Sequence, residues 1–409
     1  MEFDILRLPN GLRVLHVEDA NIMTVHCGFI INAGSRDETH DESGIAHLIE
    51  HGLFKGTQRR KAFHILTRID SVGGEINAYT TKEETCVYAT ALKEHFERAA
   101  ELLVDVTFSS KFPEKEIKKE ISVIKDEINS YKDNPDEMLV DEFEELMYPE
   151  HSLGRPILGS EENISSLTRT DIKRFVDRLY KTDQIVFACV GNLSKRKLRS
   201  FCKRILEPIQ LQESVNVTRV KPKSAEFKIE KKANVHQVHS LIGKSTFGLD
   251  DDRVRTMVML NNILGGPALN SRLNLKIREK MGYCYYIESH YNAYTDCGIF
   301  EIYFGTDKRH FNKVNRLIKK ELDILKDRRL TDRMLTAAHN QLIGQIAVSQ
   351  ENRSNLMLTL GKSLLHFDRV DSFAEMKKEI ESITAREIQD LATELFESGT
   401  MSQLSYVPE

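Results

Sequence analysis

The chain repeats one pattern of helix and strand signals at an interval of about 215 residues, which restricts the folds open to it. Ser166–Ile172, at the start of a helical run of apolar residues, matches Ser382–Ile388 in residue type and order. Each copy leads into strand-like sequence, Gln184–Val190 in the first and Gln403–Val407 in the second. Several matches in the same order are typical of an internal duplication. We therefore predict two homologous halves.

Within each half, short strand-like runs alternate with longer helical patterns. This mixture predicts an α+β fold in which each half is a mainly antiparallel sheet with helices packed on it. The stretch around Glu207–Pro222 contains two prolines and has no clear period, so we place the linker there, at residues 211–224. The halves are then 1–210 and 225–409. The predicted strand runs are Arg13–Val17, Thr24–Ile31, Thr85–Thr90, Ile185–Val190 and Phe300–Phe304.

The first half contains His47-Leu48-Ile49-Glu50-His51, which places two imidazoles and a carboxylate on one short stretch. On a helix, residues four apart project from the same face, so His47 and His51 can bind one Zn²⁺. Glu50 lies at the rim of that face, where it can take a proton from the attacking water. The order is the inverted form of the common zinc-protease motif. The alternative is a surface helix that happens to carry two histidines.

The flanking sequence supports a helix over Gly44–Leu53 that is anchored in a core. Asp41-Glu42-Ser43 offers a cap at its start, and acidic groups there suit the positive end of a helix dipole. Ile45, Leu48 and Ile49 supply part of an apolar side. A rigid helix holds ligands to the tolerance that metal chemistry requires.

A third protein ligand is expected on the helical stretch Glu116–Tyr131. Its isoleucines recur at helical spacing, and Glu120 and Glu127 fall along the same stripe. A carboxylate on a buried face is costly unless it is paired or binds metal. We favour Glu127 as the third ligand and Glu120 as a partner that orients a histidine. In the alternative reading, both reach out to water from the edge of the stripe.

The second copy of the repeat lacks these residues. His47, Glu50 and His51 align with Leu260, Ile263 and Leu264, and Glu120 and Glu127 align with Ala338 and Gln345. We therefore expect one Zn²⁺ per chain, in the first half only.

With these motifs the chain resembles the pitrilysin or insulinase (M16) superfamily of zinc metallopeptidases, most closely its short bacterial members of the processing-peptidase type. The resemblance covers essentially the whole chain. It includes Leu8–Val14, Gly34–Glu38, Gly44–Thr57, Gly73–Thr80 with Glu83-Glu84-Thr85, and Asp126-Glu127-Ile128. At the interval found in the family, the third zinc ligand falls on Glu127. The resemblance also implies two halves hinged as a clamshell, an enclosed chamber and a homodimer.

The resemblance further implies two substrate-binding segments. Paired glycines open the extended run Gly73–Thr80, which suits close backbone approach. In the family this edge strand adds the substrate as a further strand, so Gly74, Asn77, Ala78 and Tyr79 are predicted to contact it. The alternative is an ordinary strand with a glycine bulge.

In the second half, Arg278 and Tyr285 match a family Arg and Tyr that reach the substrate near the metal. Tyr283 is a competing aromatic, and all three can instead be packing residues.

Composition restricts the compartment and the partners. The formal net charge is −4 without a long basic run, so nucleic acid is not expected as a partner. The sequence has no apolar stretch of membrane-spanning length and no recognisable leader, so we predict a cytoplasmic protein without membrane association. Six cysteines without paired short spacing are expected to be reduced thiols.

The predicted function is a zinc-dependent endopeptidase that cleaves short or unfolded peptides. One alternative is the catalytic subunit of a presequence-processing heterodimer. The other is a non-catalytic structural relative, although such relatives tend to have broken metal motifs.

Overall fold

The computed structural model describes residues 3–214, 219–397 and 401–409, and these form two compact units. Neither unit is continuous in sequence. The first consists of Met1–Asn129, Arg155–Arg219 and Val348–Phe373. The second consists of Ser130–Gly154, Val220–Ala347 and Ala374–Glu409. Residues 215–218 of the predicted linker lie outside the described part of the chain, and the domain limits at 211–224 stay a prediction.

The first unit is built on a sheet of six strands in the order β1-β2-β6-β3-β5-β4. All neighbouring strands are antiparallel except β2 and β6, which are parallel. The strands are β1 (Phe3–Arg7), β2 (Arg13–Glu18), β3 (Thr24–Ile31), β4 (Glu75–Thr80), β5 (Thr85–Leu92) and β6 (Ile185–Gly191).

Seven helices contribute to the core on one face of this sheet. Successive strand residues point to opposite faces, so Cys27, Phe29 and Ile31 of β3 face this helical layer and are fully buried. The helices are α1 (Ile45–Leu53), α2 (Ala62–Asp70), α3 (Phe96–Ser109), α4 (Glu114–Lys132), α6 (Glu161–Ser166), α7 (Arg169–Leu179) and α8 (Lys195–Phe201), which continues into the π-helix Cys202–Leu206.

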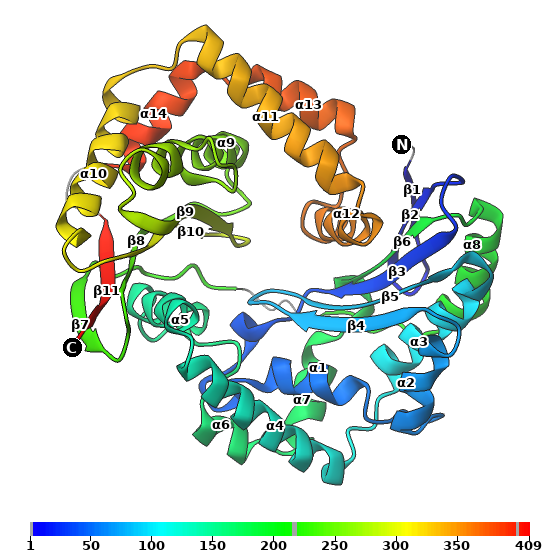
Figure 1. Cartoon of the computed structure of the whole chain (residues 1–409). Helices are drawn as coiled ribbons and strands as arrows, with labels where there is room; N and C mark the ends of the chain where they lie inside the picture. Colours follow the sequence, from blue (N-terminus) through cyan, green and yellow to red (C-terminus); the bar gives the residue numbers. More distant parts are fainter. Residues whose placement is uncertain (1–2, 215–218, 398–400) are drawn as a thin grey trace. The chain divides into compact units, whose positions relative to one another are not determined.

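The opposite face of the sheet is covered by α12 (Arg353–Phe367), which comes from the second predicted half. Figure 1 shows α12 lying across β6 and β3, on the side of the sheet away from α1 and α7. A Cβ at Gly361 would lie 2.5 Å from Ile30 Cδ1 and 3.2 Å from Ala188 Cβ. The glycine therefore allows the helix to approach the sheet closely.

The second unit has a five-stranded sheet in the order β7-β11-β8-β10-β9. Only β7 and β11 are parallel. The strands are β7 (Lys228–Ala233), β8 (Val238–Thr246), β9 (Cys284–Ala293), β10 (Gly298–Thr306) and β11 (Ser402–Pro408).

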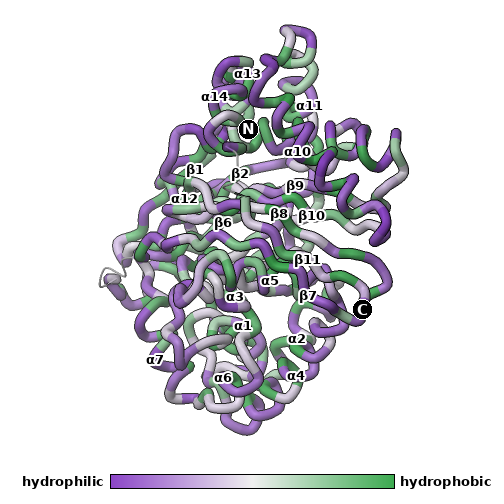
Figure 2. The backbone as a smooth tube through the Cα atoms, turned by 90° about the vertical axis from the view of Figure 1, so that its left-hand side faces the viewer, coloured by the Kyte–Doolittle hydropathy of each residue, from purple (hydrophilic) through white to green (hydrophobic). Residues whose placement is uncertain are grey.

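Phe300, Ile302 and Phe304 of β10 point into the core formed with the helices on one face. These helices are α9 (Val254–Gly265), the π-helix Asn274–Glu279, α10 (Phe311–Asp327), α11 (Asp332–Gln350), α13 (Phe373–Ser382) and α14 (Ala385–Leu395). Purple and green stretches alternate along α10, α11, α13 and α14 in Figure 2, as expected for amphipathic helices packed on a sheet.

The other face of this sheet is covered by α5 (Pro135–Met147), which comes from the first predicted half. Phe143 of α5 packs against Gly243 of β8, where a Cβ would come within 2.9 Å of the ring. Pro135 and Arg353, the first residues of α5 and α12, are 218 residues apart, close to the interval of the repeat. The two halves thus exchange equivalent helices.

The α+β prediction with mainly antiparallel sheets is confirmed. The predicted strand Thr24–Ile31 coincides with β3, and the other predicted runs differ from the observed strands by at most two residues at either end. Within the described residues, no helix is both long and apolar enough to cross a membrane.

Candidate metal centre

Helix α1 carries the two predicted histidine ligands and begins at a left-handed glycine. Gly44 has φ 89°, a conformation that costs little only for glycine. The Glu38 carboxylate accepts hydrogen bonds of 2.9 Å from the backbone N–H groups of Gly44 and Ala46. Glu38 therefore satisfies donors that are otherwise unpaired at the start of a helix.

The predicted cap Asp41-Glu42-Ser43 is wrong. Asp41 and Glu42 belong to a separate 3₁₀ turn, His40–Glu42, and Ser43 follows it. Glu42 accepts a hydrogen bond from the N–H of Thr39. Glu42 also pairs with Arg178 at 2.7 Å. The turn at Gly44 redirects the chain, so a carboxylate six residues earlier reaches the helix start. Local spacing rules do not show this contact.

The structure brings His47, His51 and Glu127 together. The side-chain ligand atoms of the three residues all lie within 4.8 Å of one another, and this is the single such group among the residues that the structure describes. Glu127 Oε2 lies 4.0 Å from His47 Nε2 and 3.8 Å from His51 Nε2. His47 is buried and His51 is half-buried, while the Glu127 side chain is 38% exposed. All three belong to the first unit.

The residues fit a zinc ion. Two imidazoles and one carboxylate are the ligand set of a catalytic zinc site that keeps a position open for water. Ligands of a tetrahedral zinc lie roughly 3.3 Å apart. The distances from Glu127 Oε2 to the two histidine nitrogens are wider than this by about 0.5 and 0.7 Å. The Glu127 side chain is partly exposed, so other rotamers are open to it.

The charge states also suit a metal. Burial lowers the pKa of His47 to about 4, with a smaller contribution from the neighbouring His51. The imidazole is therefore neutral near pH 7, and a neutral ring nitrogen has the lone pair that binds metal. The His47 Nδ1 atom is buried without a hydrogen-bond partner among the described residues.

Glu50 lies between the two histidines in sequence and contacts the end of β4. Burial raises the pKa of its carboxyl, while hydrogen bonds from Thr80 and the charge of His51 act in the opposite direction. A carboxylate with a raised pKa is a better proton acceptor near neutral pH. Thr80 ends the predicted substrate-binding strand, but no sequence motif marks it as a partner of Glu50.

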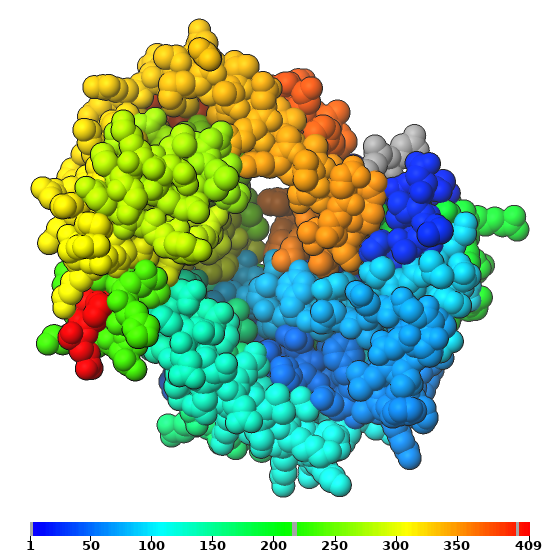
Figure 3. Space-filling view, in the orientation of Figure 1, coloured from blue at the N-terminus to red at the C-terminus, as the bar shows by residue number. Residues whose placement is uncertain are grey.

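Glu120 and Glu127 both lie on α4, whose outer side chains reach the surface in Figure 3. Glu120 is buried, and its Oε2 accepts a hydrogen bond of 3.1 Å from His51 Nδ1. Its other oxygen, Oε1, lies 2.7 Å from Lys55 Nζ. Lys55 was not predicted as a site residue. The available signal was its position four residues after His51, just beyond the end of α1 at Leu53.

The predicted substrate-binding strand is β4, which lies at the edge of its sheet and, among the described residues, pairs with β5 alone. Gly73 has φ +72°, and a Cβ at Gly74 would lie 2.6 Å from Ile69 Cγ2. Ala78 is buried in the core beneath α1, and Asn77 is exposed. Tyr79 packs toward α12, so its side chain has a structural contact there.

Arg278 and Tyr285 lie in the second unit. Arg278 donates a hydrogen bond to Asn274, and Tyr285 is 84% exposed. Tyr283 instead stacks on His310, with ring centroids 4.5 Å apart, and is a packing residue. The role of Arg278 and Tyr285 in substrate binding stays a prediction.

In the second unit, the positions equivalent to His47, His51 and Glu120 carry apolar side chains, and the position equivalent to Glu127 carries the amide of Gln345. Leu260 and Leu264 of α9 are fully buried in its core. Ala338 of α11 packs in the same core. These side chains offer no lone pair to a metal.

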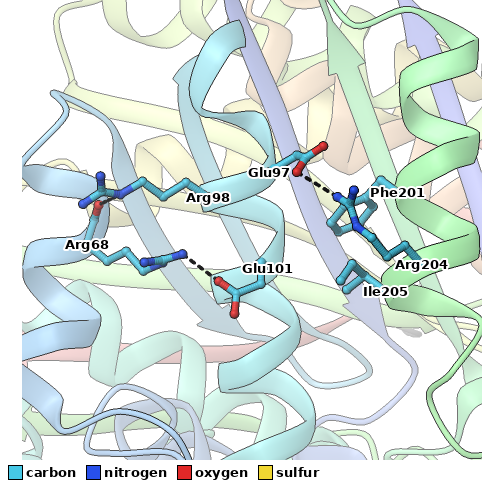
Figure 4. Close-up of a pocket in the computed structure, with 7 residues that line it drawn as sticks. All are labelled: Arg68, Glu97, Arg98, Glu101, Phe201, Arg204 and Ile205. Atoms are coloured by element: carbon cyan, nitrogen blue, oxygen red, sulfur yellow. Dashed lines mark hydrogen bonds and ion pairs between the residues drawn. The ribbon is translucent and has the colours of Figure 1, made fainter.

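The first unit also has a surface hollow of about 440 Å³ between α2, α3 and the π-helix Cys202–Leu206 (Figure 4). It shares no residue with the metal centre. Two of its three guanidinium groups are paired with carboxylates, since Arg68 pairs with Glu101 and Arg204 with Glu97, both at 2.7 Å. The third, that of Arg98, donates to the backbone oxygen of Arg68.

Sequence models of the peptidase M16 family match both halves of the chain. The model described as insulinase (peptidase family M16) matches residues 13–161, and the one described as peptidase M16 inactive domain matches residues 166–342. A relative from Bacillus subtilis, named an uncharacterized zinc protease, is 33% identical over 95% of this chain and 94% of its own length. The chain belongs to the M16 peptidase family.

Further relatives support this assignment to M16. A protein from Rickettsia felis, also named an uncharacterized zinc protease, is 32% identical over 98% of this chain and 97% of its own. Among solved structures, a protease from Helicobacter pylori matches with a TM-score of 0.91 and 21% identity over 100% of both chains. A peptidase M16 inactive domain from Pseudomonas fluorescens matches with a TM-score of 0.91 and 19% identity, over 100% of this chain and 98% of its own. At such identities the structural matches establish the fold.

Proposed function

We propose that this M16 peptidase is a zinc-dependent endopeptidase that cleaves short or unfolded peptides. His47, His51 and Glu127 would hold one zinc ion per chain, completing the inverted motif. The observation that carries the proposal is the convergence of these three ligand atoms beside the carboxylate of Glu50. The names of the zinc-protease relatives support the same metal.

When bound, zinc activates water and polarises the peptide carbonyl. The protein residues then have separate tasks. Glu50 accepts the proton of the attacking water and delivers it to the nitrogen of the leaving amine. Thr80 holds Glu50 through hydrogen bonds. Glu120 fixes the ring of His51.

Substrate binding is proposed at β4. An edge strand offers unpaired backbone groups, to which an extended peptide adds by main-chain hydrogen bonds that tolerate many sequences. Gly74, Asn77, Ala78 and Tyr79 belong to this segment, and Arg278 and Tyr285 are proposed to contact the same substrate. We further propose an enclosed chamber that selects substrates by access, and a homodimer.

The test uses the full chain, purified alone. We expect about one zinc per chain, a native mass twice 47.0 kDa, and cleavage of a mixed peptide pool that a chelator abolishes. A metal-free, inactive chain would contradict the proposal. Activity that appears only with a second, different chain would instead favour a processing heterodimer.

The Glu50→Gln variant separates metal binding from proton transfer. It removes the proton acceptor and keeps the size of the side chain, so zinc content should stay near wild type while kcat falls by a factor of at least about 100. Glu116→Gln on the exposed side of α4 is the matched control and should retain normal turnover. Normal turnover of Glu50→Gln would disprove the assignment of Glu50 as the base.

A further inference from the structure

Glu120 connects two side chains that leave the C-terminal end of α1. Its Oε2 accepts the hydrogen bond of 3.1 Å from His51 Nδ1, and its Oε1 accepts from Lys55 Nζ at 2.7 Å. An ionised carboxylate can only accept hydrogen bonds, so the proton of the His51 ring is placed on Nδ1. Nε2 is then left with a lone pair, and this atom faces Glu127.

The ammonium group of Lys55 offsets the charge of a carboxylate that is largely removed from water. The Glu120 side chain is only 9% exposed, whereas that of Lys55 is 30% exposed. A buried carboxylate without a positive partner is strongly unfavourable. Lys55 itself keeps contact with solvent, so its own desolvation is smaller.

Holding both oxygens also fixes the plane of the carboxylate. A glutamate carboxyl otherwise rotates broadly about its last bond. With Lys55 on one oxygen, the other stays directed at His51. The other histidine, His47, has no carboxylate that orients its ring, since its Nδ1 lacks a hydrogen-bond partner among the described residues. Among the two histidine ligands, the one with a fixed ring is therefore His51, which is oriented through its contact with Glu120 and the contact of Glu120 with Lys55.

We propose that Lys55 is a positioning residue of the metal centre, which acts through Glu120 to orient the imidazole of His51 for metal binding. The inference rests on the proposed zinc site. Lys55 makes no contact with substrate in this scheme. Its contribution is to the affinity and the geometry of the bound metal.

The test measures metal affinity in full-length variants. Lys55→Met keeps the length of the side chain and removes the charge. Zinc affinity, measured by competition with a chromophoric chelator, should fall about tenfold, as is typical when the support of a ligand is lost. The absorption spectrum of the Co²⁺-substituted protein should change as well, because the orientation of His51 changes. Lys55→Arg keeps the charge and should restore most of the affinity.

Lys119→Met is the matched control. Lys119 lies on α4 and pairs with a glutamate, Glu116, at 2.8 Å, but this pair has no contact with a histidine. The zinc affinity and the Co²⁺ spectrum of the Lys119→Met variant should equal those of wild type. Far-UV circular dichroism of all metal-free variants checks that each one folds.

A double-mutant cycle tests the route through Glu120. In a Glu120→Gln background, Lys55→Met should lower the zinc affinity little further, because the hydrogen bond between residue 120 and His51 is already altered. A full tenfold loss in that background would show that Lys55 acts independently of Glu120 and would overturn the inference. Wild-type affinity and spectrum in Lys55→Met alone would also overturn it. Failure of the wild-type chain to bind zinc would instead reject the proposed function.

Discussion

Glu50 lies on helix α1, Glu38 and Glu120 lie beside it, and each carboxyl group contacts a different kind of group. Glu38 accepts from backbone N–H groups, Glu50 from Thr80, and Glu120 from an imidazole and an ammonium group. A fourth carboxylate, that of Glu127, faces both histidines. The four glutamates therefore have different roles because their surroundings differ. They are, in sequence order, the helix cap, the proposed base, the group that orients a histidine and the proposed metal ligand.

Glu38 provides a test at this scale. Removing its carboxyl in Glu38→Ala leaves two N–H groups at the start of α1 without an acceptor, so the free energy of unfolding should fall by about 2 kcal/mol. Burial raises the pKa of Glu38 to about 8, so the carboxyl is mostly neutral at pH 7 and Glu38→Gln should cost less than Glu38→Ala. Urea unfolding at pH 7 measures both.

The matched control is Asp41→Asn, a substitution in the cap that the sequence wrongly favoured. The Asp41 side chain is fully exposed, so the free energy of unfolding of Asp41→Asn should equal that of wild type. A larger loss in Asp41→Asn than in Glu38→Ala would contradict our description of the helix start.

The ligand residues could be predicted because their spacing follows from helical geometry. His47, His51 and Glu127 are marked by a local motif and by one buried stripe. Glu38 and Lys55 could not be assigned in the same way. The reach of Glu38 depends on the left-handed turn at Gly44, and that of Lys55 on where α4 packs.

At the scale of elements, the exchanged helix α12 is attached to the first sheet by both packing and charge. Leu356, Leu360 and Leu364 are buried against the sheet. At the C-terminal end of the helix, His366 Nε2 donates to Glu84 Oε1 at 2.6 Å. Lys362 Nζ lies 3.2 Å from the second oxygen of Glu84.

This contact predicts a pH dependence of stability. Burial alone would raise the pKa of Glu84, but the hydrogen bond from His366 and the charges of Lys362 and His366 lower it to about 2, below the ordinary value of 4.5. A carboxyl with a lowered pKa stabilises the fold above its unfolded-state pKa and loses this effect as the pH falls toward the folded-state value. The stabilisation, about 3 kcal/mol, is therefore present at pH 7 and declines below pH 4.5.

Urea unfolding of Glu84→Gln and wild type across this pH range checks the sign. The difference in unfolding free energy should be largest at neutral pH and should shrink on acidification. Glu97→Gln, which breaks an exposed pair with Arg204, is the control and should change stability little at any pH. A Glu84→Gln deficit that grows at low pH would show that the sign is wrong.

The individual strands and helix α1 could be predicted from periodicity and residue type, but the exchange of α5 and α12 could not. An amphipathic helix shows which of its faces is buried, and it carries no local signal for which sheet it covers. Gly361 illustrates this limit. Within the sequence it is a glycine in a helix, and its role follows only once Ile30 is known to lie against it.

At the scale of the whole molecule, the exchange means that neither unit is complete within one half of the chain. A chain ended at residue 210 would lack α12, and the apolar face of β6 and β3 would be exposed. The same shortened chain would keep α5 but would lack the second sheet, against which α5 packs. Experiments on the metal centre therefore require the full chain, although all three proposed ligands lie in the first unit.

In the proposed metal centre, a single chain holds one metal ion between helices α1 and α4. Crystals of the purified full-length protein, measured on either side of the zinc absorption edge, test it directly. We predict one anomalous peak per chain within about 2.0–2.2 Å of His47, His51 and Glu127. An anomalous map with no peak at these side chains, or with a zinc ion held by other residues, would show that these three residues are not the zinc ligands.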